Sequence, residues 1–246
     1  MSSESIKPYD SQGDKTEQVR EMFDNIAPAY DRLNRAMSFG LDRSWRRRAV
    51  AMVAATRPAH IIDIATGTGD FALQLAQAMP QASITGLDLS QGMIEVGRAK
   101  VEAAGLSHRI TLQVGDCLAP PAELTGAADA VTVAFGVRNF ANLAAGYRAM
   151  HDMLRPGGML CVIELSTPTS PFVKPLYHLY TSTVIPLMGR AVSHDNRAYS
   201  YLPESIAAVA QGEQMLALMR GAGLVDARFI PLTMGVCTIY TAFRPK

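Results

Sequence analysis

The stretch Ile61-Ile62-Asp63-Ile64-Ala65-Thr66-Gly67-Thr68-Gly69-Asp70 decides the fold of this chain. Its first half is a short apolar run, typical of a buried strand, and a helical pattern follows the two glycines up to Met79. Glycine adopts positive φ easily and has no Cβ, so a ligand can approach the backbone of such a turn closely. Because ligands of open parallel sheets bind beyond the carboxyl ends of the strands, we expect a binding site at Gly67 and Gly69.

Apolar runs and helical patterns alternate on both sides of this turn. Strands are expected at 60–65, 83–87, 109–114, 128–135 and 159–165, with helices after the glycine turn, at 92–104 and at 143–154. Continuous apolar strands that alternate with helices form parallel sheets that are covered on both faces. Another helix, 212–222, precedes strands at 225–231 and 236–243, whose short connection favours an antiparallel pair. The fold class is therefore α/β, with a mostly parallel sheet.

The two segments outside this alternation set the domain organisation. Residues 1–15 are polar and predict a disordered tail, so a single domain is expected over 16–246. It begins with helices over 16–57, the second of which we expect Asp42 to cap. Residues 168–203 are rich in proline and aromatic residues, and their prolines exclude one uninterrupted helix. We expect this insertion to form a lid over a substrate.

Composition excludes several classes of protein. The formal net charge of the 246-residue chain is +1, which gives no electrostatic argument for a nucleic-acid partner. Its 3 cysteines form no metal-binding or disulfide pattern, which favours a reducing compartment. The polar start has no apolar run of the kind a secretory signal needs. We therefore expect a cytoplasmic protein with no metal site.

Carboxylates at strand ends suggest the ligand. Asp88 ends the second predicted strand, where a carboxylate can accept hydrogen bonds from both hydroxyls of a ribose. The glycine turn and Asp88 also fit a dinucleotide-binding fingerprint, so the sequence equally allows an NAD(P)-dependent oxidoreductase at this point. Asp63 inside the first strand, and Asp116 after the third, where it could bond an adenine amino group, favour a methyltransferase that uses S-adenosylmethionine.

Four ordered motifs carry a resemblance to a known family. They are Ala29-Tyr30-Asp31-x-x-Asn34-x-x-x-Ser38 with Trp45-Arg46, Phe135-Gly136-Val137-Arg138-Asn139, Leu154-Arg155-Pro156-Gly157-Gly158-x-Leu160-x-x-x-Glu164-x-Ser166, and Tyr199-x-Tyr201-Leu202-Pro203-Glu204-Ser205-Ile206. Together they make the chain similar to the UbiE/MenG quinone C-methyltransferase family. The Arg-Pro-Gly-Gly element occurs in many methyltransferases, whereas the other three motifs are more specific.

The resemblance implies a fold, a reaction and a set of site residues. The fold would be the Rossmann-like class I S-adenosylmethionine-dependent one, a seven-stranded, mostly parallel sheet with one antiparallel strand and helices on both faces. The reaction would be C-methylation of demethylmenaquinol to menaquinol in menaquinone biosynthesis, or of a polyprenyl benzoquinol in ubiquinone biosynthesis. The cofactor S-adenosyl-L-methionine would be bound by Thr68, Asp88, Asp116 and Cys117, together with the turn glycines Gly67 and Gly69.

Three residues are candidates for the chemistry. A quinol carbon becomes nucleophilic when a ring hydroxyl loses its proton, and phenols have a pKa of about 10. Arg138, which follows the fourth strand among apolar neighbours, is expected to stabilise the developing phenolate, or else to bind loop carbonyls together with Asn139. His194, beside Asp195, is a candidate acid/base group within the predicted lid.

The substrate also suggests partners. Apolar residues of the insertion could line a channel for an isoprenoid tail, or equally belong to the core or a homodimer surface. The arginines of the second helix could touch anionic lipid, which would place the protein peripherally at a membrane; they are Arg43, Arg46, Arg47 and Arg48. A methyltransferase for a small soluble acceptor and a non-catalytic cofactor-binding protein remain alternatives.

Overall fold

A seven-stranded sheet forms the centre of the protein, whose computed structural model describes residues 3–9, 12–185 and 196–246. The strand order is β3-β2-β1-β4-β5-β7-β6. The strands are β1 His60–Ile64, β2 Ser83–Asp88, β3 Ile110–Val114, β4 Ala128–Ala134, β5 Leu154–Leu165, β6 Val225–Leu232 and β7 Cys237–Phe243. Only β7 is reversed, since it pairs antiparallel with β5 and β6, while β1 to β5 pair in parallel. The predicted mostly parallel sheet with one antiparallel strand is confirmed within the described chain.

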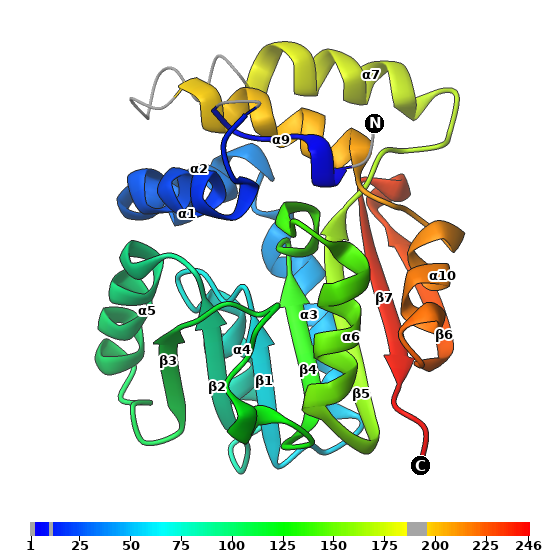
Figure 1. The fold of residues 1–246 in the computed structure, drawn as a ribbon. Coiled ribbons are helices and arrows are strands. Elements are labelled where there is room, and N and C mark those ends of the chain that lie inside the picture. The colour runs from blue at the N-terminus through cyan, green and yellow to red at the C-terminus, as the bar shows by residue number, and fades with distance from the viewer. Residues whose placement is uncertain (1–2, 10–11, 186–195) are drawn as a thin grey trace.

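Helices cover both faces of the sheet. Successive strand residues point to opposite sides, and here the side chains on both sides are apolar and need to be buried. On one face Ile61 packs with α3 (Leu41–Ala54), α4 (Asp70–Ala78) and α5 (Gln91–Ala103). On the other, Ile62 and Ile64 pack with α6 (Leu143–Met153) and α10 (Glu213–Gly221). Figure 1 shows these two layers on either side of the strands. Both clusters are continuous and apolar, so they fix the register that brings the strand ends to one edge.

A third layer lies across the carboxyl ends of the parallel strands (Figure 1). It consists of α1 (Lys15–Ile26), α2 (Tyr30–Met37), α7 (Val173–Leu179) with the π-helix Tyr180–Val184, and α9 (Asn196–Ala208). Its own apolar cluster joins α1 residues such as Met22 to Ile185 and Tyr201 from the insertion. The predicted insertion therefore lies over the edge of the sheet where a ligand would bind; its central residues, 186–195, lie outside the described residues.

The start of the chain differs from the predicted disordered tail. Within residues 3–9 and 12–15, Ser3 is completely buried, and Glu4 Oε1 accepts the Leu143 N–H at 2.8 Å, at the start of α6. The ammonium of Lys15 donates to the Ser3 carbonyl at 2.7 Å and to the Phe140 carbonyl at 3.1 Å. Polar residues hold this segment through main-chain partners that lie far away in sequence, so local composition could not reveal the contacts.

Two local predictions need correction. Gly40, with φ of 74°, is the cap of α3, and Asp42 lies in its first turn, where it accepts from the Ser38 hydroxyl at 2.8 Å and pairs with Arg46. Strand β5 begins at Leu154 rather than at residue 159, because Leu154 already pairs with β4 and the Arg-Pro-Gly-Gly segment forms an irregularity within the strand, where Gly157 has φ of 80°.

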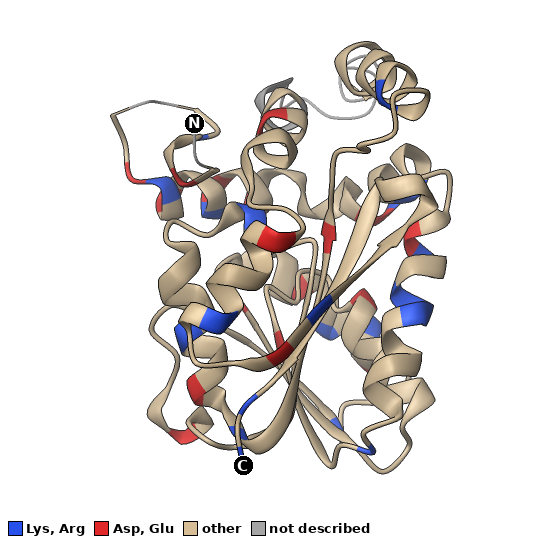
Figure 2. Cartoon of the chain, turned by 90° about the vertical axis from the view of Figure 1, so that its right-hand side faces the viewer, with Lys and Arg blue, Asp and Glu red and all other residues tan. Residues whose placement is uncertain are grey.

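Charges of both signs are interspersed along the chain, and α7 carries a single charged residue, Lys174 (Figure 2). No helix among the described residues is both long and apolar enough to cross a bilayer.

Candidate active site

The glycine turn lies at the carboxyl end of β1 and is supported from below. Gly67 and Gly69 both have positive φ, 56° and 74°, and Gly69 caps α4. Beneath the turn, the Asp63 carboxylate accepts the hydroxyls of Thr66 at 2.7 Å and Thr132 at 2.6 Å. Burial raises the pKa of Asp63 to about 6, although the two hydroxyl bonds oppose the shift. Asp63 therefore supports the turn from within the protein.

Asp88 faces the turn from the end of β2. Its Oδ2 accepts the Gly67 N–H at 2.8 Å, and its Oδ1 accepts the Ser90 N–H at 2.9 Å. Desolvation raises the pKa of this carboxyl, partly offset by the two backbone bonds. Each carboxylate oxygen has two lone pairs, so each can accept one further hydrogen bond. Two adjacent acceptors in this position suit a vicinal diol.

Asp116 and Cys117 form the next part of the wall, after β3. Asp116 Oδ1 accepts the Leu118 N–H at 2.8 Å, and one bond of this kind leaves the carboxylate able to accept others. The Cys117 side chain is buried, and desolvation raises its thiol pKa strongly, so it stays protonated and acts as an apolar surface. Leu89 and Phe140 add apolar surface around the same pocket.

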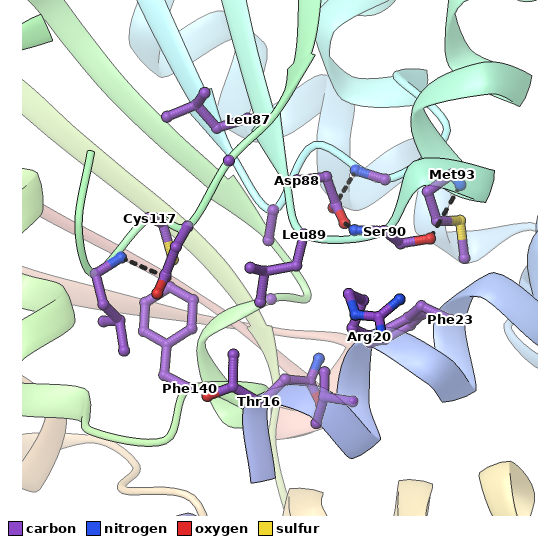
Figure 3. Close-up of a pocket in the computed structure, with 18 of the residues that line it drawn as sticks. Thr16, Arg20, Phe23, Leu87, Asp88, Leu89, Ser90, Met93, Cys117 and Phe140 are labelled. Carbon is purple, nitrogen blue, oxygen red and sulfur yellow. Dashed lines mark hydrogen bonds between the residues drawn. The ribbon is translucent and has the colours of Figure 1, made fainter. Parts of the chain in front are cut away.

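Helix α1 forms the roof of this pocket. Figure 3 shows Thr16, Arg20 and Phe23 of α1 across the pocket from Asp88. The helix is fixed there by Asp24, whose Oδ1 accepts the Ser90 hydroxyl at 2.6 Å and the Gly92 N–H at 2.9 Å. The pocket is therefore enclosed between the strand ends and the amino-terminal helices.

A second, mostly apolar cavity of about 440 Å³ adjoins the first. Tyr30 and Phe135 line both, so they form the shared wall. Phe135 holds a left-handed backbone with φ of 62°, a conformation that costs energy in a non-glycine residue and often marks a functional site. The outer wall comes from α2, α3, α7 and the π-helix, including Met37, Leu176 and Tyr180.

Arg138 lies in the wall of the second cavity and is 6% exposed. Its Nη1 donates to Glu164 Oε1 at 2.9 Å and to the Phe135 carbonyl, and its backbone N–H donates to Glu164 Oε2 at 3.1 Å. Burial raises the pKa of Tyr177 and of Tyr201 to about 12, and the positive charge of Arg138 opposes both shifts. The guanidinium thus favours ionised phenols in its surroundings.

The sequence as a whole matches a known family. The sequence model of the ubiE/COQ5 methyltransferase family matches residues 11–244. The chain belongs to this family. It is 46% identical over 239 residues to the demethylmenaquinone methyltransferase of Bacteroides fragilis, covering 97% of each protein. It is also 44% identical to the same-named protein of Porphyromonas gingivalis, with 99% of this chain and 100% of that protein covered.

A more distant relative carries a broader name. The ubiquinone/menaquinone biosynthesis C-methyltransferase UbiE of Geotalea daltonii is 43% identical over 93% of this chain and 97% of that protein.

Solved structures share the fold of this ubiE/COQ5 family member at low identity. The [4+2]-cyclase SpnF superposes with a TM-score of 0.67 at 18% identity, covering 94% of this chain and 96% of that one. Human N-acetylserotonin methyltransferase in complex with SAM gives 0.60 at 18% identity, covering 95% and 63%. The fold is that of class I S-adenosylmethionine-dependent methyltransferases, but a cyclase among its neighbours shows that fold alone does not fix the reaction.

The structure brings together most of the residues that the sequence singled out. Five line the first pocket: Gly67, Asp88, Asp116, Cys117 and Asn139. Arg138 lines the adjoining cavity, and Asn139 Oδ1 accepts the Tyr201 hydroxyl at 3.2 Å. The alternative role for Arg138, binding loop carbonyls, is also seen, since it bonds the Phe135 carbonyl. His194 lies outside the described residues.

Gly69 and Thr68 were also predicted to bind the cofactor, but neither lines the pocket. Gly69 caps α4. The Thr68 side chain has partners on other helices. Its buried hydroxyl donates to Asp31 Oδ1 at 2.6 Å and accepts from Lys100 Nζ at 3.2 Å, so its side chain joins an ionic cluster rather than the pocket lining. The same cluster includes Asp70, which pairs with Lys100. Thr68 therefore fastens α2 and α5 to the glycine turn.

Sequence reasoning missed two parts of the site. The α1 roof had no motif of its own, because α1 is a mostly polar helix and its pair of Arg20 and Asp24 has the ordinary i,i+4 spacing of a helix surface. Arg46 belongs to a run of arginines predicted to face outward, but it is 6% exposed and lines the second cavity. Its spacing from Asp42, Ala49 and Val53 on one helical face was the signal for burial.

Proposed function

We propose that this protein transfers a methyl group from S-adenosylmethionine to a ring carbon of demethylmenaquinol, giving menaquinol. The observation that carries the proposal is the shared wall of Tyr30 and Phe135 between a pocket with strand-end carboxylates and an apolar cavity that contains Arg138. The names of the relatives supply the substrate class. A polyprenyl benzoquinol of ubiquinone biosynthesis is the second candidate, supported by the name of the Geotalea daltonii relative.

The first pocket fits the nucleoside part of the cofactor. Asp88 would hold the two ribose hydroxyls, because each of its oxygens has one backbone bond and room for another. Asp116 would accept from the adenine amino group, and Gly67, without a Cβ, allows the ligand to lie against the backbone. Bound there, the cofactor supplies a methyl group already activated on a sulfonium.

The residues of the second cavity prepare the acceptor. Arg138 would stabilise the phenolate that forms when a ring hydroxyl loses its proton, which concentrates electron density on the adjacent carbon. The guanidinium itself stays protonated and does not remove that proton. The ring carbon would bond to the methyl group as the methyl–sulfur bond breaks, which leaves a neutral thioether, and the ring proton would pass to water, which restores aromaticity. The protein's main contribution is to align carbon, methyl and sulfur.

The rim of the second cavity fits contact with a membrane. Exposed apolar side chains surround it: Phe39, Leu41, Leu176 and Met234 line the cavity, and Phe172 and Leu179 lie on the same face of α7 as Leu176. A polyprenyl tail would leave the cavity here. The exposed arginines Arg43 and Arg47 of α3 would attract anionic headgroups.

Two assays test these proposals. Purified protein with S-adenosylmethionine should methylate a short-chain demethylmenaquinol, detected by mass spectrometry, and should prefer it to a benzoquinol and to a soluble catechol. Methylation of the catechol alone would overturn the proposal. For the membrane, the Phe172→Ser/Leu179→Ser variant should cosediment less with vesicles that contain phosphatidylglycerol, and unchanged cosedimentation would reject the contact.

A further inference from the structure

Two buried guanidinium groups, rather than one, line the second cavity. Arg46 comes from α3 and Arg138 from the segment Val137–Asn139 after β4, and each is only 6% exposed. They share Phe135 as a neighbour: Arg46 Cζ lies 5.2 Å from the centre of its ring, and Arg138 bonds its carbonyl. Two cations are thus held at one apolar wall, next to the cofactor pocket.

Each arginine has one carboxylate partner and uses one nitrogen to reach it. Arg46 Nη1 pairs with Asp42, and Arg138 Nη1 pairs with Glu164. The Nε atom of each is buried without a hydrogen-bond acceptor in the described part of the chain. A buried donor without a partner costs about 1–3 kcal/mol, so such groups are rarely left unpaired. The Nη2 atom of each guanidinium also has no hydrogen bond to the described residues, and it is not among their fully buried atoms, so each arginine of the cavity wall keeps a donor for a ligand acceptor.

We propose that Arg46 binds the second oxygen of the acceptor ring, the one para to the hydroxyl that Arg138 stabilises. This inference rests on the proposed function, because a 1,4-quinol carries two such oxygens on opposite sides of its ring. Asp42 and Glu164 offset the two cationic charges, so the cavity suits a neutral quinol with one ionising hydroxyl. Arg46 is then a residue that selects hydroquinones over phenols with one hydroxyl.

A purely structural role would leave a different signature. Arg46 also pairs with Asp42 within its own helix and stacks on Phe135, contacts that stabilise α3 and the shared wall. Loss of these contacts would weaken every acceptor alike. Only direct contact with the para oxygen makes the effect of Arg46 depend on whether the acceptor has that oxygen.

The test compares two acceptors in two variants. One acceptor is a short-chain demethylmenaquinol, and the other is the matching naphthol, which keeps the hydroxyl next to the reacting carbon but lacks the para hydroxyl. Trp45, the only tryptophan of the chain, lines the cavity, so quenching of its fluorescence measures the Kd of each acceptor without turnover. Arg46→Met removes the guanidinium, and Arg32→Gln removes an exposed arginine on the neighbouring helix α2.

We expect the unaltered protein to bind the quinol about 10- to 100-fold more tightly than the naphthol, the worth of one hydrogen bond to a charged donor. Arg46→Met should reduce this preference to less than about threefold, whereas Arg32→Gln should keep it. Full preference in Arg46→Met, with S-adenosylmethionine affinity intact, would overturn the inference. If Arg46→Met does not fold, Arg46→Gln serves: it keeps a polar side chain beside Asp42 but has no charge, so the preference should fall to that of a neutral hydrogen bond, below about 10-fold, and full retention would reject the role.

The outcomes separate this inference from the proposed function. Binding that prefers the quinol and depends on Arg46, without methyl transfer, would support the inference about Arg46 and reject the reaction. Methyl transfer to the quinol, with equal affinity for the quinol and the naphthol, would support the reaction and reject the inference about Arg46.

Discussion

The carboxylate of Glu164 holds both the main chain and the side chain of Arg138. Its Oε2 accepts the Arg138 backbone N–H at 3.1 Å, and its Oε1 accepts the guanidinium Nη1 at 2.9 Å. Glu164 is almost fully buried in β5, so the pair lies away from water. One residue of the sheet therefore sets both the position of the loop after β4 and the direction of its arginine.

Removal of this carboxylate should strongly destabilise the protein. Breaking a buried ion pair leaves an uncompensated charge, which costs about 3–5 kcal/mol. We expect Glu164→Ala to lower the free energy of unfolding in urea by about that amount. Glu213→Ala, which breaks an exposed pair with Arg220, is the matched control and should change it by less than about 1 kcal/mol. An equal decrease in the free energy of unfolding in the two variants would contradict the prediction that the buried ion pair contributes more to stability than the exposed one.

Asp88 should control cofactor affinity. Its two oxygens lie at the turn, each with capacity for one ribose hydroxyl, and bonds to charged groups are worth about 1.5–3 kcal/mol each. Asp88→Ala should raise the Kd for S-adenosylmethionine by about 100-fold or more in isothermal titration calorimetry. Asp152→Ala, at an exposed carboxylate on α6, should bind normally. An unchanged Kd in Asp88→Ala would remove Asp88 from the site.

Asp63 should make the stability of the protein depend on pH. Burial raises its pKa from 3.8 to about 6 in the folded state. Between these values the folded protein holds a proton that the unfolded chain releases, so stability falls as pH rises from about 4 to about 6. Asp63→Asn has no such titration. Its free energy of unfolding relative to the natural protein should increase across this window and then level off, whereas parallel pH curves would refute the assignment.

Lys15 should hold the start of the chain against the loop of Arg138. Its ammonium donates to the carbonyls of Ser3 and Phe140, and burial lowers its pKa to about 8. Lys15→Met removes these bonds while keeping an apolar stem. We expect faster amide hydrogen exchange over 137–140, read by mass spectrometry, with unchanged exchange in β1. Lys174→Met, at an exposed residue of α7, is the comparison; the same protection over 137–140 in both variants would refute the role.

The sequence predicted the sheet well because its signals are local. Apolar strands, glycine turns and helical periodicity are properties of neighbouring residues, and the parallel topology then places Asp88 and Asp116 at one edge. The lining of the first pocket by both residues follows from topology alone. The reversed position of β7 followed from the short connection between the last two strands.

The parts that the sequence did not predict depend on contacts between distant segments. The Thr68 side chain turns away from the pocket because Asp31 and Lys100, from two other helices, bind its hydroxyl. The order of the first residues depends on the carbonyl of Phe140. Arginine is usually exposed, so its residue type predicts a surface position for Arg46, whereas its position on the buried face of α3 places it inside the protein.

The shared wall of the two cavities also constrains how ligands leave. Tyr30 begins α2, which the short 3-10 turn Ala27–Ala29 joins to the α1 roof, and Tyr30 lines both cavities. A movement of these amino-terminal helices that opens the first pocket, and so releases the demethylated cofactor, would therefore also move a wall of the second cavity, where the quinol would bind. Release of the two products would then be coupled through this helix pair.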